Sequence, residues 1–228
     1  ILAPMFGAWI LTFFPWQAIF ITLAVIGVIC CLCVHFFFKE SLPVERRLNL
    51  SLYQVTTLYA AILKDESFRR PMFAGCLTGA ALFCYISSAS AVFMGQYGLS
   101  QQQFSYAFAL NAGGIMLMSS LNKHLNARMD IFPRLCLGGT IQCFGALIVV
   151  SAGLMNHAPL WLLMSGLFLV VSGIGLTGPN AMALAMSKQG ARAGTASAIM
   201  GSMQFACDLV GAASLNFLIW TASLTLGS

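Results

Sequence analysis

Four polar side chains lie inside long apolar runs, where they could carry chemistry that their neighbours cannot. Asp208 is the only charged residue in the interior of a predicted membrane span, and Gln204 precedes it by one helical turn. Asn111 and Tyr85 lie deep in two other apolar runs. A carboxyl group at such a depth could exchange a proton or bind a cation, and amide and phenol groups could hydrogen-bond to a solute. We therefore predict that these four residues face a cavity.

The same residues also have a structural interpretation. An ionised carboxylate at mid-depth costs ~2.5–3.5 kcal/mol on insertion scales, so Asp208 could be a protonated packing residue or could face a water-filled vestibule. Asn111 and Tyr85, like Asn180 and Gln142, could hydrogen-bond one helix to another, because an unpaired amide in lipid is unfavourable. The residue types alone leave both interpretations open.

The elements that position these residues are predicted to be membrane helices. Of the 228 residues, 59% are hydrophobic and 7% are charged, whereas a soluble domain carries about 25% charged residues. A helix needs about 20 apolar residues to cross the bilayer core, and alternation typical of a membrane barrel is absent. Six runs meet this length, and a shorter run at residues 1–14 reads as the last part of a further span. The six are residues 16–38, 71–94, 102–121, 134–155, 159–187 and 191–219.

Positive charge sets the predicted orientation. All 11 Lys and Arg residues lie in three segments, 39–70, 123–134 and 188–192, which alternate with uncharged turns. Because Lys and Arg are retained on the cytoplasmic side, we expect residues 39–70, 122–133 and 188–190 to face the cytoplasm of a multi-pass protein in the bacterial inner membrane. The net charge of +5 is explained by this orientation and by contact with anionic membrane lipid, so no nucleic-acid partner is predicted.

The long polar segment 39–70 divides the chain. Leu52, Val55, Leu58 and Ile62 recur at helical spacing within it, which predicts either a helix lying on the inner leaflet or a plain linker helix. We expect residues 1–38 to end one helix bundle, residues 39–70 to form a cytoplasmic loop, and residues 71–228 to form a second bundle.

Small residues and proline predict close packing and bending of particular spans. Gly75 and Gly79 form a GxxxG pattern, which allows helices to approach closely. Pro179 follows Gly178 inside a span and is expected to bend that helix. Flexible Met and Phe side chains in the spans could line a cavity for varied ligands, although such residues are also ordinary in membrane spans. They are Phe83, Phe93, Met94, Phe104, Phe108, Met116 and Met118.

Several other kinds of chemistry are not predicted. The eight cysteines all lie in apolar runs, so a disulfide framework is not expected. Cys31 and His35 are one helical turn apart, but two ligands rarely suffice for a metal, and no metal site is predicted. Walker, HExxH and GxSxG motifs are absent, so we expect neither an enzyme nor a bound cofactor.

Several short stretches resemble the Bcr/CflA group of drug-resistance transporters within the major facilitator superfamily. Residues 2–9, with Pro4 and Gly7, are similar to the end of the antiporter motif in the family's fifth helix, although Ala8 departs from its second glycine. The most specific matches are residues 108–112, 178–181 and 193–198. Residues 39–43 and 121–134 resemble the end of helix six and the basic connection between helices eight and nine.

This resemblance implies an incomplete major facilitator fold, all-α, with part of helix five and helices six to eleven. It implies secondary transport of small amphiphilic drugs by a monomer, driven by a proton gradient. Pro4, Gly7, Gly178 and Pro179 would then serve helix packing and gating. The family usually ties proton coupling to an acidic residue in its first helix, which has no counterpart here. Asp208 is not a position where the family typically has a carboxylate.

Two alternatives to drug export stay open at this point. A metabolite or sugar transporter would have the same fold and a different cargo. The chain starts within an apolar run and ends without a charged stop, so it could also be a truncated membrane protein that does not transport.

Overall fold

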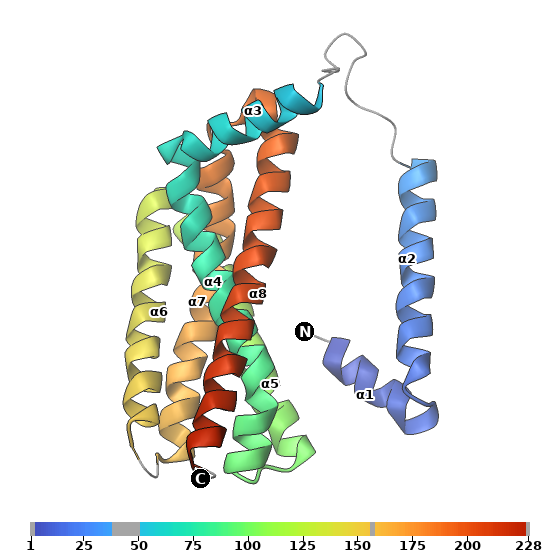
Figure 1. The fold of residues 1–228 in the computed structure, drawn as a ribbon, viewed down its shortest axis with the longest axis vertical. Helices are drawn as coiled ribbons and strands as arrows, with labels where there is room; N and C mark the ends of the chain where they lie inside the picture. Colours follow the sequence, from blue (N-terminus) through green and yellow to red (C-terminus); the bar gives the residue numbers. More distant parts are fainter. Residues whose placement is uncertain (1–2, 38–50, 156–157, 227–228) are drawn as a thin grey trace. The chain divides into compact units, whose positions relative to one another are not determined.

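A computed structural model describes residues 3–37, 51–155 and 158–226, and the regular structure in these ranges is helical (Figure 1). The chain divides into two compact units, Ile1–Val55 and Thr56–Ser228. The first contains α1 (Ala3–Phe13) and α2 (Gln17–Phe37), and α3 (Leu52–Lys64) spans the boundary. The second unit continues with α4 (Glu66–Ser90), η2 (Ala91–Gln96), α5 (Gln101–Leu125), α6 (Ile131–Gly153), α7 (Leu160–Met186), η3 (Gly190–Arg192) and α8 (Ala193–Leu226).

The expected membrane helices are confirmed for five spans. These helical segments are long and apolar enough to cross a bilayer: Gln17–Phe37, Glu66–Gln96, Gln101–Leu125, Ile131–Gly153 and Leu160–Met186. The sixth expected span corresponds to α8, which is a helix but is not among these five, so its crossing stays a prediction. The short run at residues 1–14 forms α1. Residues 39–43, which carried part of the family resemblance, lie outside the described residues.

The ends of α4 differ from the sequence prediction. The helix begins at Glu66 rather than Pro71, because the side chain of Asp65 accepts a hydrogen bond from the backbone N–H of Ser67 and caps the first turn. At its other end the helix continues into a π-helical segment, η2, which buries Phe93. Gly98, with φ of +65°, then turns the chain toward α5.

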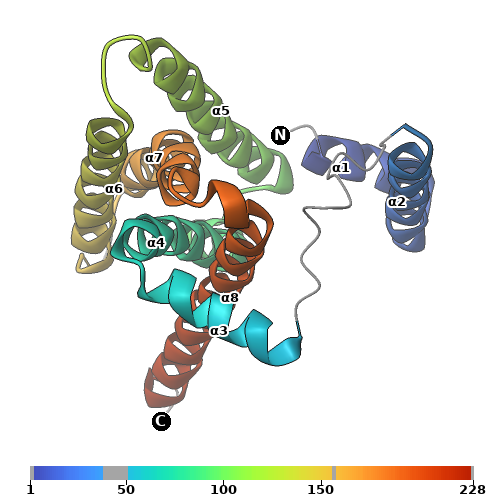
Figure 2. The ribbon, with the colours of Figure 1, turned by 90° about the horizontal axis from the view of Figure 1, so that it is seen from above.

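Helix α7 is the centre of the second unit. It packs against α4, α5 and α6, while α8 packs mainly against α4 (Figure 2). Small residues allow these approaches: a methyl group added at Gly145 would lie 2.8 Å from the carbonyl oxygen of Gly166, and one added at Gly211 would lie 3.1 Å from Ala80 Cβ. Because the hydrophobic effect contributes little to helix association in lipid, close van der Waals contacts of this kind stabilise membrane helix bundles.

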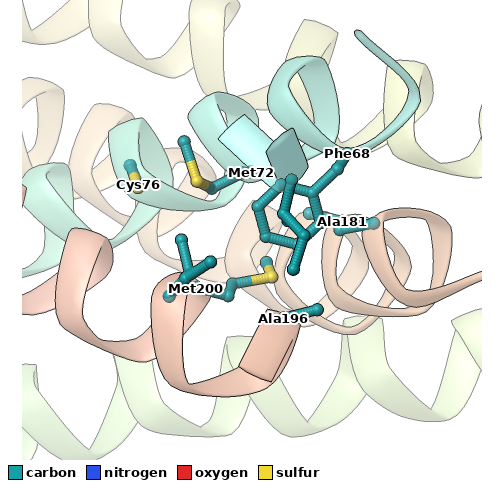
Figure 3. Packing of buried hydrophobic residues seen from close by; sticks show 9 residues of the cluster. Phe68, Met72, Cys76, Ala181, Ala196 and Met200 are labelled. Atoms are coloured by element: carbon teal, nitrogen blue, oxygen red, sulfur yellow. The ribbon is translucent and has the colours of Figure 1, made fainter. Parts of the chain in front are cut away.

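The apolar core near the α3 end of the unit joins four helices. Ile62 of α3 is fully buried, and Leu58 packs against the same cluster. Figure 3 shows Phe68, Met72 and Cys76 of α4 packed with Ala181 of α7 and with Ala196 and Met200 of α8. The helix predicted within residues 39–70 is therefore present, and Leu58 and Ile62 attach it to the bundle. Its position on a membrane surface stays a prediction, as does the three-part division of the chain.

Candidate functional site

Tyr85 and Asn111 meet between α4 and α5. The amide nitrogen Nδ2 of Asn111 donates a hydrogen bond of 2.9 Å to the Tyr85 hydroxyl oxygen, and the two residues are 1% and 6% exposed. The ring of Tyr85 stacks on Phe108, with centroids 5.6 Å apart. Two of the four predicted residues are thus in direct contact. Their bond is the interhelical contact that the structural interpretation anticipates.

One polar atom of α5 and one of α7 have no hydrogen-bond partner in the described part of the chain. They are Oδ1 of Asn111 and Oγ of Ser172, and both are buried. Ser172 of α7 fits against Gly114 of α5, where a methyl group would overlap its hydroxyl. Unpaired buried polar atoms are unfavourable, so this contact between α5 and α7 has unused hydrogen-bonding capacity for water or a polar ligand.

Gln204 and Asp208 lie on α8 beside Gly79 of α4. Asp208 is 2% exposed, and its Oδ1 atom has no partner among the described residues. A methyl group at position 79 would lie 3.1 Å from Gln204 Nε2 and would overlap Asp208 Oδ1. The GxxxG pattern therefore marks the place where α4 accommodates the carboxyl group, a pairing that the sequence did not predict.

Among the residues predicted to serve packing and gating, Gly7 and Gly178 have fewer close neighbours than Gly79. A methyl group at Gly7 would meet nothing within 4 Å, and one at Gly178 would meet only Ile174 of its own helix, at 4.0 Å. Pro179 lies inside a continuous α7 and is exposed. The side chain of Pro4 lies outside the described residues. The gating roles of these four residues stay predictions.

A polar network centred on Arg134 was missed by the sequence analysis. Arg134 is 5% exposed; its Nη1 donates to Oδ1 of Asn122 at 2.9 Å and its Nη2 to Oδ1 of Asn126 at 2.7 Å. Nδ2 of Asn180 donates to the same Asn122 oxygen at 2.8 Å. The charge pattern placed Arg134 near a membrane edge but did not indicate that it is buried between α5, α6 and α7. The sequence feature that could have indicated this network is the presence of Asn122, Asn126 and Asn180 near the ends of two predicted spans.

A second polar link joins the start of α4 to the connection between α7 and α8. Nε2 of Gln189 donates to Oδ2 of Asp65 at 3.1 Å, and Gln189 is buried. Hydrogen bonds from the side chain and the backbone N–H of Ser67 hold the pKa of Asp65 below its usual value, and the bond from Gln189 adds to this effect. The carboxylate of Asp65 thus both caps α4 and contacts the loop that precedes α8.

A groove of about 830 Å³ runs between α4, α6 and α7. Its lining is mostly apolar, with residues such as Leu77 and Val170, and it includes the polar side chains of Thr78 and Gln142. Thr78 Oγ1 donates to Gln142 Oε1 at 3.3 Å, and Gln142 Nε2 donates to the carbonyl oxygen of Val170 at 3.2 Å. Gln142 therefore joins helices, as one of its two interpretations anticipated. None of the four residues predicted to face a cavity lines this groove.

These features define a multi-pass helical membrane protein with polar side chains buried between its spans. The sequence model of the Major Facilitator Superfamily matches residues 1–212. The chain belongs to this superfamily, as the resemblance of its motifs implied, and it is a protein of the bacterial inner membrane.

Similar proteins include several named for drug resistance. The chain is 28% identical over 210 residues to the bicyclomycin resistance protein homolog of Haemophilus influenzae, covering 92% of this chain and 52% of that protein. It is 33% identical over 204 residues to the uncharacterized MFS-type transporter YdgK of Bacillus subtilis, covering 88% and 50%. It is 25% identical over 228 residues to the multidrug resistance protein MdtL of Citrobacter koseri, covering 96% and 56%. The chain spans about half the length of these relatives.

Proposed function

We propose that this protein acts in the export of small amphiphilic compounds across the bacterial inner membrane, driven by the proton gradient. The observation that carries the proposal is the superfamily match over residues 1–212 together with relatives named for bicyclomycin and multidrug resistance. In this proposal the cargo crosses the membrane without chemical change, so the protein is a transporter and not an enzyme.

The buried polar groups support this function. Alternating access in such folds depends on polar sites near the bilayer midplane, between helices that move against one another. Asn111 of α5 and Ser172 of α7 each keep an unpaired buried polar atom, and Asp208 has one at the α4–α8 contact. We assign the first pair to solute contact and Asp208 to proton exchange. In this proposal the protein acts as a monomer, and its partners are the solute and membrane lipid.

Ethidium efflux from drug-sensitive bacteria that express the protein tests this proposal. We expect loaded cells to lose ethidium faster than cells with an empty vector, and we expect an uncoupler of the proton gradient to abolish the difference. Equal efflux in both strains, with the protein present in the membrane, would contradict the proposal. Accelerated uptake of a radiolabelled sugar instead would favour the metabolite or sugar transporter.

A further inference from the structure

The attachment of α8 to the rest of its unit runs mainly through α4. Its described residues pack along that helix and only slightly against α7 (Figure 1). Three glycines lie at this contact: Gly75 faces Met200, Gly79 faces Gln204 and Asp208, and Gly211 faces Ala80. A change at any of these points alters the only extensive packing surface that the described part of α8 has.

Asp208 occupies the middle of this contact without a counter-charge. It is 2% exposed, one carboxyl oxygen has no hydrogen-bond partner, and no salt bridge of the described residues includes it. The titratable groups that interact with it from α4 are the thiols of Cys76 and Cys84. On its own helix Cys207 is adjacent, and Gln204 is polar but uncharged. Among these groups there is no cation that could compensate an ionised carboxylate.

The two protonation states of Asp208 therefore differ in how well they fit against α4. A neutral carboxyl group can be buried beside Gly79 at a modest cost in unmade hydrogen bonds. An ionised carboxylate without a cation is much less favourable in such a place and gains free energy by reaching water. Separation of α8 from α4 near Gly79 would bring water to the buried Oδ1 atom.

We propose that a proton on Asp208 holds α8 against α4 at Gly79, and that loss of this proton loosens the contact. Gly79 makes the arrangement possible, because any side chain at this position would overlap the carboxyl group. Asp208 is then a protonation site and Gly79 is a positioning residue. The proposal concerns one helix contact and does not depend on which solute, if any, the protein carries.

The buried thiol of Cys76 reports on this contact, because it is 1% exposed and packs with α8 residues. The test uses the whole chain in lipid nanodiscs with Cys76 as its sole cysteine, and follows maleimide labelling from pH 5.5 to pH 8.5. The same labelling of an Asp208→Asn variant is measured at each pH, so that their ratio removes the ordinary pH dependence of thiol reactivity. A sole-Cys136 form, whose thiol is exposed on α6, serves as the control.

We expect the ratio of parent to Asp208→Asn labelling to be near one in acid and to rise by up to about tenfold per pH unit once Asp208 ionises. Repulsion between the carboxylate and a Cys76 thiolate would slow labelling, so a rise must come from separation of the helices. Gly79→Ala should accelerate Cys76 labelling already in acid, without affecting Cys136. A ratio that stays constant with pH would overturn the proposal. If Asp208→Asn does not fold, a parent Cys76 profile parallel to that of Cys136 would overturn it as well.

Discussion

Tyr85 and Asn111 share a single hydrogen bond across two helices, and its strength can be measured. Interhelical bonds of this kind contribute about 0.6 kcal/mol on average and at most about 1.7 kcal/mol, because chains unfolded in the membrane also find partners. We expect Tyr85→Phe and Asn111→Ala to show a coupling energy in this range in a double-mutant cycle. Reversible unfolding in detergent provides the free energies. Strictly additive effects would mean that the bond is not formed.

Asn122 is the shared acceptor of the Arg134 network. Asn122→Ala would leave Nη1 of Arg134 and Nδ2 of Asn180 without this acceptor in a buried place, so we expect a loss of about 1–3 kcal/mol in unfolding free energy. Asn126→Ala is the matched control, because Asn126 is exposed and water can replace its single bond to Arg134. We expect the control to cost less than about 0.5 kcal/mol. Equal losses for the two variants would contradict this account of the network.

Asp65 gives the first turn of α4 a pH dependence of known sign. Its pKa in the folded protein is lowered, chiefly by the hydrogen bond from the Ser67 side chain, so its charge stabilises the fold above the unfolded pKa. This contribution is lost as the pH falls through the lower, folded pKa. We expect the stability advantage over Asp65→Asn, which keeps a capping side chain, to shrink below about pH 4. Asp130→Asn is the control, because Asp130 makes no side-chain capping bond. If the stability difference between the parent protein and Asp65→Asn did not change in acid, the Asp65 carboxylate would not be the source of this pH dependence.

At the level of helices, two adjacent glycines of α6 distinguish the effect of tight helix packing on stability from the effect of helix propensity. A methyl group at Gly138 would lie 2.8 Å from Leu176 Cβ and 3.0 Å from the backbone nitrogen of Thr177. A methyl group at Gly139 would meet nothing within 4 Å. We expect Gly138→Ala to destabilise the protein by about 1–3 kcal/mol through overpacking. Gly139→Ala should be neutral or stabilise it by up to about 1 kcal/mol, because alanine favours helix. Thermal unfolding in detergent distinguishes them, and the opposite order would show that α6 and α7 pack differently.

The helices themselves could be predicted from the sequence, because the bilayer fixes the length of an apolar span and leaves helix as its form. The ends of the helices were less predictable. Because Asp65 caps α4, the helix begins before the predicted start, and no residue pattern indicated the π-helical segment η2. Which faces meet depends on glycines in several helices at once. For this reason Tyr85 and Asn111 could be named as buried polar residues but not as a pair. The burial of Arg134 could not be predicted, because the same charge pattern describes an exposed and a buried arginine near a membrane edge.

For the whole molecule, we predict that solute export is coupled to proton movement. The most direct measurement uses inverted membrane vesicles from cells that express the protein, with the lumen acidified by respiration and followed with a fluorescent pH probe. Adding ethidium should release protons from the lumen in a dose-dependent manner, and vesicles with an empty vector should show no such release. Ethidium accumulation without proton release, or neither process despite inserted protein, would contradict the account.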